Sequence, residues 1–286
     1  MRPRSQFVIF KQSPFSNACR DVAAVATVCV FLFPVFWWGL TSIKPESAIN
    51  NLDGRAWSSF TPTLANYTGA IFADINLKFD IRQPLIDTIL VASGAALLTL
   101  ALALPAAYGL ARFGFRRGQP FVASLFLLKM LPPIATIIPV VTLFRGLELL
   151  DTRTGLMLAH TALNLPLAIL LLKSFFDETP KEVAEAASID GANRLQIFWK
   201  IEVPAIKQGI VATLLLSFLS SWTEFFMSVF LTHSIQMLPV QFVNVSSWSW
   251  GFTSAYSTAS LVPGICFILL IQKHLARGLT WGLQRS

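Results

Sequence analysis

Charged residues are scarce in this chain of 286 residues: they make up 13% of it, whereas hydrophobic residues make up 54%. Together with 24 Phe and 8 Trp, this composition excludes a soluble domain with a solvated surface. Several apolar runs approach the ~20 residues that a helix needs to cross ~30 Å of hydrocarbon. They do not alternate apolar and polar residues as the strands of a membrane barrel do. The sequence therefore predicts an all-α, polytopic membrane protein.

Residues for catalysis and metal binding are also scarce. The cysteines, Cys19, Cys29 and Cys266, have no metal-ligand spacing, and we interpret them as free thiols that behave as small buried hydrophobes. Three scattered histidines and the absence of His-Glu-x-x-His exclude the usual metal sites. No basic patch is interleaved with aromatic residues, so nucleic acid is not an expected partner. We expect no enzymatic activity, no metal and no cofactor bound by this chain.

The apolar runs predict six membrane-spanning helices, with approximate bounds 22–43, 85–110, 121–144, 156–176, 205–231 and 255–272. We expect these helices to accommodate interior prolines such as Pro132 and Pro133. In a membrane, neighbouring helices, hydroxyl groups and waters satisfy the carbonyls that proline leaves free.

Lys and Arg indicate how the spans are oriented. They concentrate near the N-terminus, after the second and fourth spans, and near the C-terminus. Because cytoplasmic loops carry the excess of Lys and Arg, we expect both termini to be cytoplasmic. The predicted organisation is a cytoplasmic N-terminal segment (1–20), a six-helix domain (21–283) with a cytoplasmic loop at 177–204, and a C-terminal end (284–286).

The 177–204 loop is polar and carries strong signals for helix ends. Thr179, Pro180 and Glu182 have the pattern of a capping box with proline at the first helical position. Gly191 permits the left-handed backbone that ends a helix, and Asn193 with Gln196 predicts a second capping box that starts another helix. The loop is therefore predicted to be rigid: a helix, a glycine turn and another helix. By local physics it is either an insert for a groove on another protein or an amphipathic connector lying on the membrane.

The spacing in this loop resembles a known signature. Glu185-Ala186-Ala187, three residues, Gly191, nine residues and Ile201-x-Val203-Pro204 are similar to E-A-A-x3-G-x9-I-x-L-P of binding-protein-dependent ABC importer permeases, with Val203 in place of Leu. The stretches 149–157, 165–192, 221–226 and 272–282 resemble the carbohydrate-uptake, maltose-G-like branch of that family. The ending "GLQRS" departs from the G-A-V-K-G continuation usual there.

The resemblance implies a type I ABC importer permease fold in a bacterial inner membrane, and a set of partners. These are a second, homologous permease subunit, two ATP-binding subunits that bind ATP and Mg, and a periplasmic solute-binding protein. The chain has no Gly-Lys pair, and hence no phosphate-binding loop of its own. The resemblance assigns the contact with the ATP-binding subunit to the first loop helix and the residues after it: Glu182, Glu185, Ala186, Ala187, Asp190, Gly191, Ala192 and Arg194.

Polar side chains inside the predicted spans are candidates for a solute path, because ionisable groups in a membrane are costly and usually functional. They follow one face of the fifth span and lie one turn apart on the fourth: Ser217, Ser221, Glu224, Ser228, His160 and Asn164. The alternative is a packing seam in which these groups bond helix to helix. Lys129 in the third span either extends to the cytoplasmic face or meets an anionic solute.

The predicted function is uptake of a sugar or sugar-like solute, driven by ATP hydrolysis in partner subunits. An anionic sugar derivative, sulfonated or phosphorylated, or a polyol is an alternative solute. A different class of function, an autonomous ion-coupled carrier that uses Glu224, would transport without ATP. An integral membrane transferase would need a catalytic constellation that the sequence lacks.

Overall fold

The computed structural model describes residues 14–50, 60–71, 81–113, 118–245 and 249–283. Within these ranges the chain is helical and contains no strand, which confirms the predicted all-α class. The long helices are α1 (Pro14–Ser42), α4 (Arg82–Arg112), α7 (Arg153–Glu178) and α14 (Trp250–Leu283). Shorter ones include α5 (Gly118–Met130), α6 (Pro133–Gly146), α11 (Lys207–Trp222), α12 (Phe226–Leu231) and α13 (Leu238–Val245).

Four of the described helices are long and apolar enough to cross a membrane, and a fifth crossing results if one bent pair counts as a single span. The prediction of a continuous third span at 121–144 is wrong, because the chain leaves the helix between α5 and α6. Leu131 and Pro132 each precede a proline, a position that disfavours helical backbone. Pro132 accordingly has ψ 130°, and Pro133 starts the new helix. The count of six spans stays a prediction.

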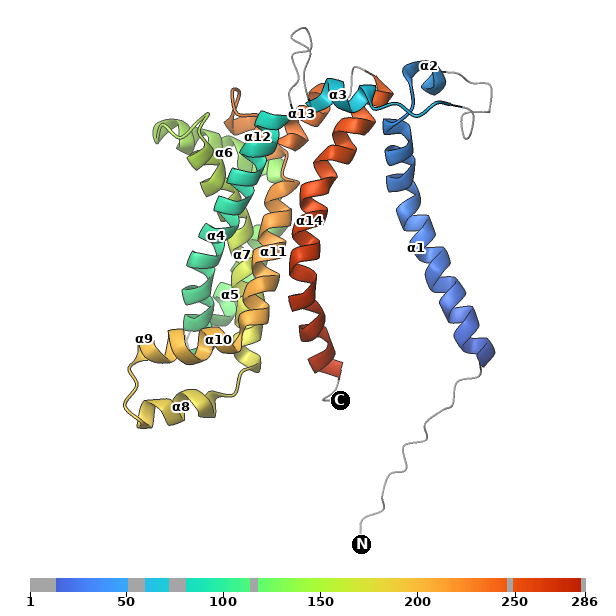
Figure 1. Ribbon diagram of the computed structural model, residues 1–286. Helices are drawn as coiled ribbons and strands as arrows, with labels where there is room; N and C mark the ends of the chain where they lie inside the picture. Colours follow the sequence, from blue (N-terminus) through green and yellow to red (C-terminus); the bar gives the residue numbers. More distant parts are fainter. Residues whose placement is uncertain (1–13, 51–59, 72–80, 114–117, 246–248, 284–286) are drawn as a thin grey trace.

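Helix α4 makes the most extensive helix contacts, against α7 and α11, which lie beside it in Figure 1. Its buried face carries small residues at helical spacing, among them Ala92, Ala96, Ala103 and Ala107. Small side chains let helix backbones approach closely, which is how helices associate in a membrane, where burial of apolar surface gives little driving force. Gly209 on α11 serves the same purpose, because a Cβ there would lie 2.5 Å from the Phe175 ring of α7.

Helix α1 lies at the side of the bundle and joins it through α14, which also packs against α11. Helix α1 diverges from the rest toward its N-terminal end (Figure 1). Apolar side chains along α1 are exposed, including Val30 at 72% and Phe31 at 77%. The three free cysteines are exposed as well, so the interpretation of them as buried residues is wrong. They lie on α1 and α14, whose outer faces nothing in this chain's described residues covers.

The bundle has two distinct ends (Figure 1). The loop end carries α8 (Lys181–Ile189), α9 (Arg194–Ile197), the π-helical turn η1 (Phe198–Glu202) and α10 (Val203–Ala205). The opposite end carries α2 (Glu46–Ile49), α3 (Ala65–Ile71), α12 and α13. The start of α1 and the end of α14 lie at the loop end (Figure 1). This arrangement agrees with a common side for the termini and the 177–204 loop, while the cytoplasmic orientation stays a prediction.

Candidate functional site

Glu224 lies in a break between two helices. The prediction of a continuous fifth span at 205–231 is therefore wrong: α11 ends at Trp222 and α12 begins at Phe226. The Glu224 carboxylate accepts hydrogen bonds from the backbone amides of Met227, at 3.1 and 3.0 Å, and Ser228, at 3.3 Å. A carboxylate at a helix N-terminus satisfies amides that have no partner within the helix and complements the helix dipole. Glu224 thus starts α12.

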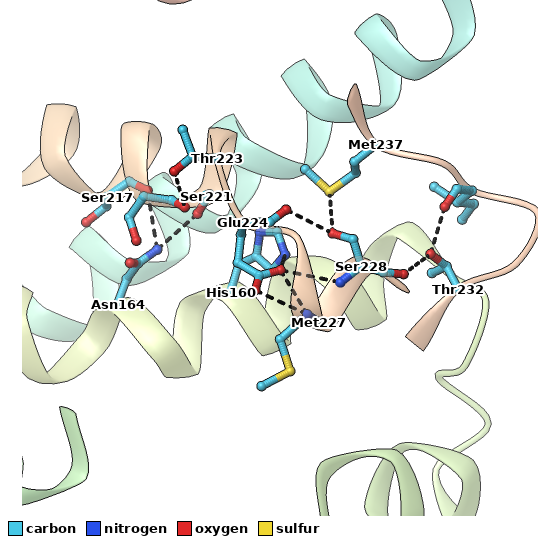
Figure 2. Close-up of polar contacts among 12 residues, drawn as sticks. His160, Asn164, Ser217, Ser221, Thr223, Glu224, Met227, Ser228, Thr232 and Met237 are labelled. Carbon is cyan, nitrogen blue, oxygen red and sulfur yellow. Dashed lines mark hydrogen bonds and ion pairs between the residues drawn. The ribbon is translucent and has the colours of Figure 1, made fainter. Parts of the chain in front are cut away.

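His160 on α7 faces this break (Figure 2). Its Nε2 lies 3.3 Å from Oε2 of Glu224, and its side chain is fully buried. Neither imidazole nitrogen has a hydrogen-bond partner among the described residues. The contact is therefore one of proximity without hydrogen-bond geometry. It places a titratable ring of α7 directly against the acidic group that starts α12.

The other polar candidates form bonds between and within helices (Figure 2). Asn164 of α7 donates to the Ser221 hydroxyl at 2.9 Å and to the Ser217 carbonyl at 3.3 Å. The Ser228 hydroxyl contacts Sδ of Met237 at 3.1 Å. Six of the seven predicted path residues thus lie along one seam between α7 and the α11–α12 pair. Lys129 lies in α5, but its side chain is outside the described part of the structure.

A small hollow opens beside this seam, between α7 and α11. Its lining combines polar and apolar side chains: Asn164, Leu167, Ala168, Leu171, Thr213, Leu216 and Ser217. The hollow has room for about one water molecule. It is therefore too small for a sugar.

The loop end matches the predicted helix–turn–helix in most respects. Gly191 has φ +84°, as expected for a left-handed turn. Asn193 and Gln196 form the predicted capping box, with both hydrogen bonds at 2.9 Å. The predicted cap at Thr179 is wrong: Pro180 precedes α8, and the Thr179 hydroxyl donates back to the Phe175 carbonyl of α7 at 3.1 Å.

The residues expected to contact a partner lie on an open surface. No residue of α8, all of which are described, is buried. Ile189 is 87% exposed and Val183 is 54% exposed, so apolar side chains accompany Glu182 and Glu185 on this surface. Arg194 differs from the rest, because its guanidinium lies 5.0 Å from the centre of the Phe113 ring, at the end of α4.

A buried ion pair at the loop end was missed by the sequence reasoning. Arg112 contacts both carboxylate oxygens of Glu202, Nε to Oε1 at 2.7 Å and Nη2 to Oε2 at 3.0 Å. The side chains are only 7% and 1% exposed. In the sequence, Arg112 is only one of the basic residues that follow the second predicted span. An acidic residue inside the apolar run before Pro204 was the available signal.

The opposite end has its own polar contacts. Arg153 Nε lies 2.7 Å from Oδ1 of Asp87. Asp151, in the turn before α7, accepts hydrogen bonds from the Ser234 hydroxyl at 2.7 Å and from the His233 and Ser234 amides at 2.9 Å. These bonds, above all that of the Ser234 hydroxyl, lower the pKa of Asp151 to about 2. The carboxylate thereby ties the α6–α7 turn to the segment after α12.

Known proteins resemble this chain over most of its length. The sequence model of a family described as binding-protein-dependent transport system inner membrane component matches residues 99–281. The chain is 30% identical over 268 residues to SmoH of Agrobacterium fabrum, a sulfoquinovosyl glycerol transport system permease protein, with 92% of each chain covered. It is 31% identical over 258 residues to SugB of Mycobacterium tuberculosis, a trehalose transport system permease protein, covering 88% of this chain and 91% of that one.

A solved structure has the same fold. It is a crystal structure of a bacterial ABC transporter involved in the import of the acidic polysaccharide alginate. The superposed chains share a TM-score of 0.74 at 21% identity, over 92% of this chain and 98% of the other. At this identity the likeness describes the arrangement of helices.

Proposed function

Because this chain belongs to the family of binding-protein-dependent transport system inner membrane components, we propose that it is the permease subunit of an ATP-driven importer for a sugar or sugar-like solute. The names of its relatives support the solute class, since one is a permease for trehalose and another for sulfoquinovosyl glycerol. An anionic sugar derivative is the second candidate. It draws on the sulfoquinovosyl glycerol relative and on the alginate importer of similar fold.

The observation that carries the coupling to ATP is the α8 surface. A rigid helix ends at a left-handed glycine, presents Glu185 and Ala186 at the family spacing, and has no buried residue. Such a helix fits a groove on another protein. The proposed partner is an ATP-binding subunit, since the sequence has no phosphate-binding loop. We place the chain in a bacterial inner membrane. Its proposed partners are two ATP-binding subunits, a second homologous permease and a periplasmic solute-binding protein.

The seam of His160, Asn164 and Glu224 is the proposed wall of the solute path. The hollow beside it admits about one water molecule, so the path proper would form against the second permease. The hydrogen bonds that fix the Glu224 carboxylate argue against an ion-coupled carrier. Three contacts with α12 amides already satisfy the group that such a carrier would need to protonate and release.

Reconstitution in vesicles tests this function. The chain, the second permease and the ATP-binding subunits are combined, and uptake is measured with solute-binding protein and a panel of neutral and anionic sugars. Uptake should require ATP and the binding protein. Glu185→Ala should lower uptake per ATP hydrolysed while leaving membrane insertion unchanged, whereas Glu46→Ala, at the opposite end, serves as the matched control. Uptake by this chain alone, or uptake that follows a proton gradient after ATP depletion, would overturn the proposal.

A further inference from the structure

Arg112, the last residue of α4, touches both ends of the loop that carries α8. Its Nη2 donates to the backbone carbonyl of Thr179, where the loop begins, at 3.1 Å. Its Nε and the same Nη2 bind the carboxylate of Glu202, where the loop ends, at 2.7 and 3.0 Å. One guanidinium therefore joins α4 to the two legs of the loop. The chain itself connects those legs only to α7 and α11.

Aromatic residues pack one helical turn away from the contact. Tyr108 of α4 packs against Phe176 at 5.5 Å and against Phe198 at 4.9 Å between ring centres. Phe176 is completely buried. The Arg112 and Glu202 side chains are themselves only 7% and 1% exposed, and in such surroundings a bidentate, charge-assisted contact is strong and is costly to break on one side only. The pair is thus a stiff connection, in contrast to an exposed pair that exchanges with water.

The surrounding elements favour transfer of movement from the α8 loop to α4. The helical segment Arg194–Ala205 meets α11 at a bend of 75°, so the loop leaves the bundle sideways and could pivot there. Arg194 adds a second contact to the end of α4, through the Phe113 ring at 5.0 Å. A displacement of α8 would therefore pull on α4 through Arg112 and on its neighbour Phe113 through Arg194. Helix α4 in turn packs against α7, which carries His160.

We propose that Arg112 and Glu202 are positioning residues that transmit the movement of the α8 loop to α4, and so to the seam around His160 and Glu224. This inference rests on the proposed function. The geometry requires arginine: a lysine ammonium is a point charge without the planar fork that binds two carboxylate oxygens and a carbonyl together. Glu202, one residue before Val203-Pro204, supplies the carboxylate for that fork.

The test compares uptake with ATP hydrolysis in the reconstituted complex. Arg112→Gln and Glu202→Gln should each lower the number of solute molecules imported per ATP by about fivefold or more, the usual lower bound for coupling between sites. The double variant should be no worse than either single variant, because the two residues form one connection. Arg153→Gln removes an arginine from the ion pair at the opposite end of α4 and should leave the ratio unchanged.

Two further variants separate coupling from mere folding. Arg112→Lys keeps the charge and should lower the ratio less than Arg112→Gln does. The exchange Arg112→Glu with Glu202→Arg rebuilds an ion pair but cannot donate from position 112 to the Thr179 carbonyl. The exchanged pair should be expressed like wild type but recover only part of the number of solute molecules imported per ATP. Full recovery of the ratio in the exchanged pair would show that the bond to the Thr179 carbonyl is not needed, and would overturn the proposed link of α4 to both ends of the loop.

Hydrogen exchange of the isolated permease gives a readout that does not depend on transport. Amides of residues 181–202 should exchange faster in Arg112→Gln than in wild type, and at the wild-type rate in Arg153→Gln. A wild-type complex without ATP-dependent uptake overturns the proposed function, and with it the coupling role. Unchanged exchange in Arg112→Gln, or a wild-type ratio of uptake to hydrolysis, overturns the inference itself.

Discussion

The two ends of α4 carry the same chemistry in different surroundings. At the loop end, Arg112 binds Glu202 through two contacts, with both side chains less than a tenth exposed, at 7% and 1%. At the opposite end, Asp87 binds Arg153 through one contact, and the arginine is 46% exposed while the aspartate is 4% exposed. Gln83 also donates to Asp87 at 3.2 Å. One pair is sealed, whereas the other keeps its cation in contact with the surroundings.

The difference teaches that an ion pair's consequence depends on what happens to the partner left behind. If Glu202 is removed, Arg112 remains buried with an uncompensated charge. If Asp87 is removed, Arg153 is already half exposed and can be solvated. The first pair is therefore expected to matter for both stability and coupling, and the second for little more than local order.

The largest expected effect is at Arg112. Arg112→Ala should lower the free energy of unfolding by about 3–5 kcal/mol, because it leaves the buried Glu202 carboxylate unpaired. Unfolding in mixed detergent micelles, followed by Trp fluorescence, would measure the change. Replacing both residues by methionine should restore much of this loss, because neither charge is then buried. An Arg112→Ala variant as stable as wild type would remove the contrast between the two ends.

Gly191 tests whether the loop end depends on backbone geometry as well as charge. A Cβ at this position meets nothing within 4 Å, so the cost of Gly191→Ala lies only in its φ of +84°. A left-handed backbone costs a residue with a Cβ about 1–2 kcal/mol. We expect the amides of residues 186–196 to exchange faster in Gly191→Ala, because the free energy of local opening falls by about that amount. Gly146→Ala is the control, since a Cβ at Gly146 also meets nothing within 4 Å. Equal exchange in both variants would contradict it.

Glu224 tests an acidic group whose partners are backbone amides in place of a guanidinium. Glu224→Ala removes the acceptor that starts α12 and should cost about 0.5–2 kcal/mol, the range for loss of a helix cap. Glu224→Gln keeps an acceptor oxygen and should cost less. Unfolding measurements on both variants distinguish them. If the two variants were equally destabilised, the negative charge, and not the hydrogen bonds to α12, would be the stabilising feature.

A smaller effect is expected at Arg153. Arg153→Ala should lower the free energy of unfolding by about 1 kcal/mol, because Asp87 is only 4% exposed but keeps the hydrogen bonds from Gln83. The same micelle titration serves as the measurement, run beside Arg112→Ala. A loss as large as that of Arg112→Ala would show that burial of the acidic partner alone decides the outcome.

The last prediction concerns the stabilisation by Asp151, which should depend on pH only in acid. The pKa of Asp151 is about 2 in the folded chain, below its ordinary 3.8. The stabilisation from its ionised form is therefore complete above the ordinary value and is lost as the pH falls through the folded value. The difference in thermal midpoint between wild type and Asp151→Asn should stay constant from pH 7 to 5 and shrink below pH 4. A difference that grows in acid would contradict this assignment.

Local signals in the sequence predicted local structure well where only one partner competed for each group. The Asn193–Gln196 box and the turn at Gly191 depend on residues within one helical turn. The prediction for Thr179 was wrong because two partners competed for its hydroxyl. The hydroxyl donates to a carbonyl of the preceding helix, and so does not cap an amide of the next one. The prediction of a continuous span through Glu224 was wrong for a related reason. The carboxylate binds backbone amides and starts a new helix where hydropathy predicts an unbroken one.

Contacts across the fold were beyond the sequence. Arg112 and Glu202 are separated by 90 positions, and nothing in either local pattern selects the other among the remaining charges. His160 and Glu224 were each identified as unusual residues for a span, but their proximity depends on how α7 meets the α11–α12 break. Composition and periodicity indicate which residues are out of place. Three-dimensional packing decides which of them meet.

The pairing of α1 with α14 has a consequence for how the protein is made. Helix α1 is synthesised well before α14, the helix against which it packs most extensively. Until α14 is synthesised, the face of α1 that packs against it lacks this partner. Contacts between distant parts of a chain form slowly, because the intervening chain must first be brought together. The contact between α1 and α14 is therefore expected to form late in assembly.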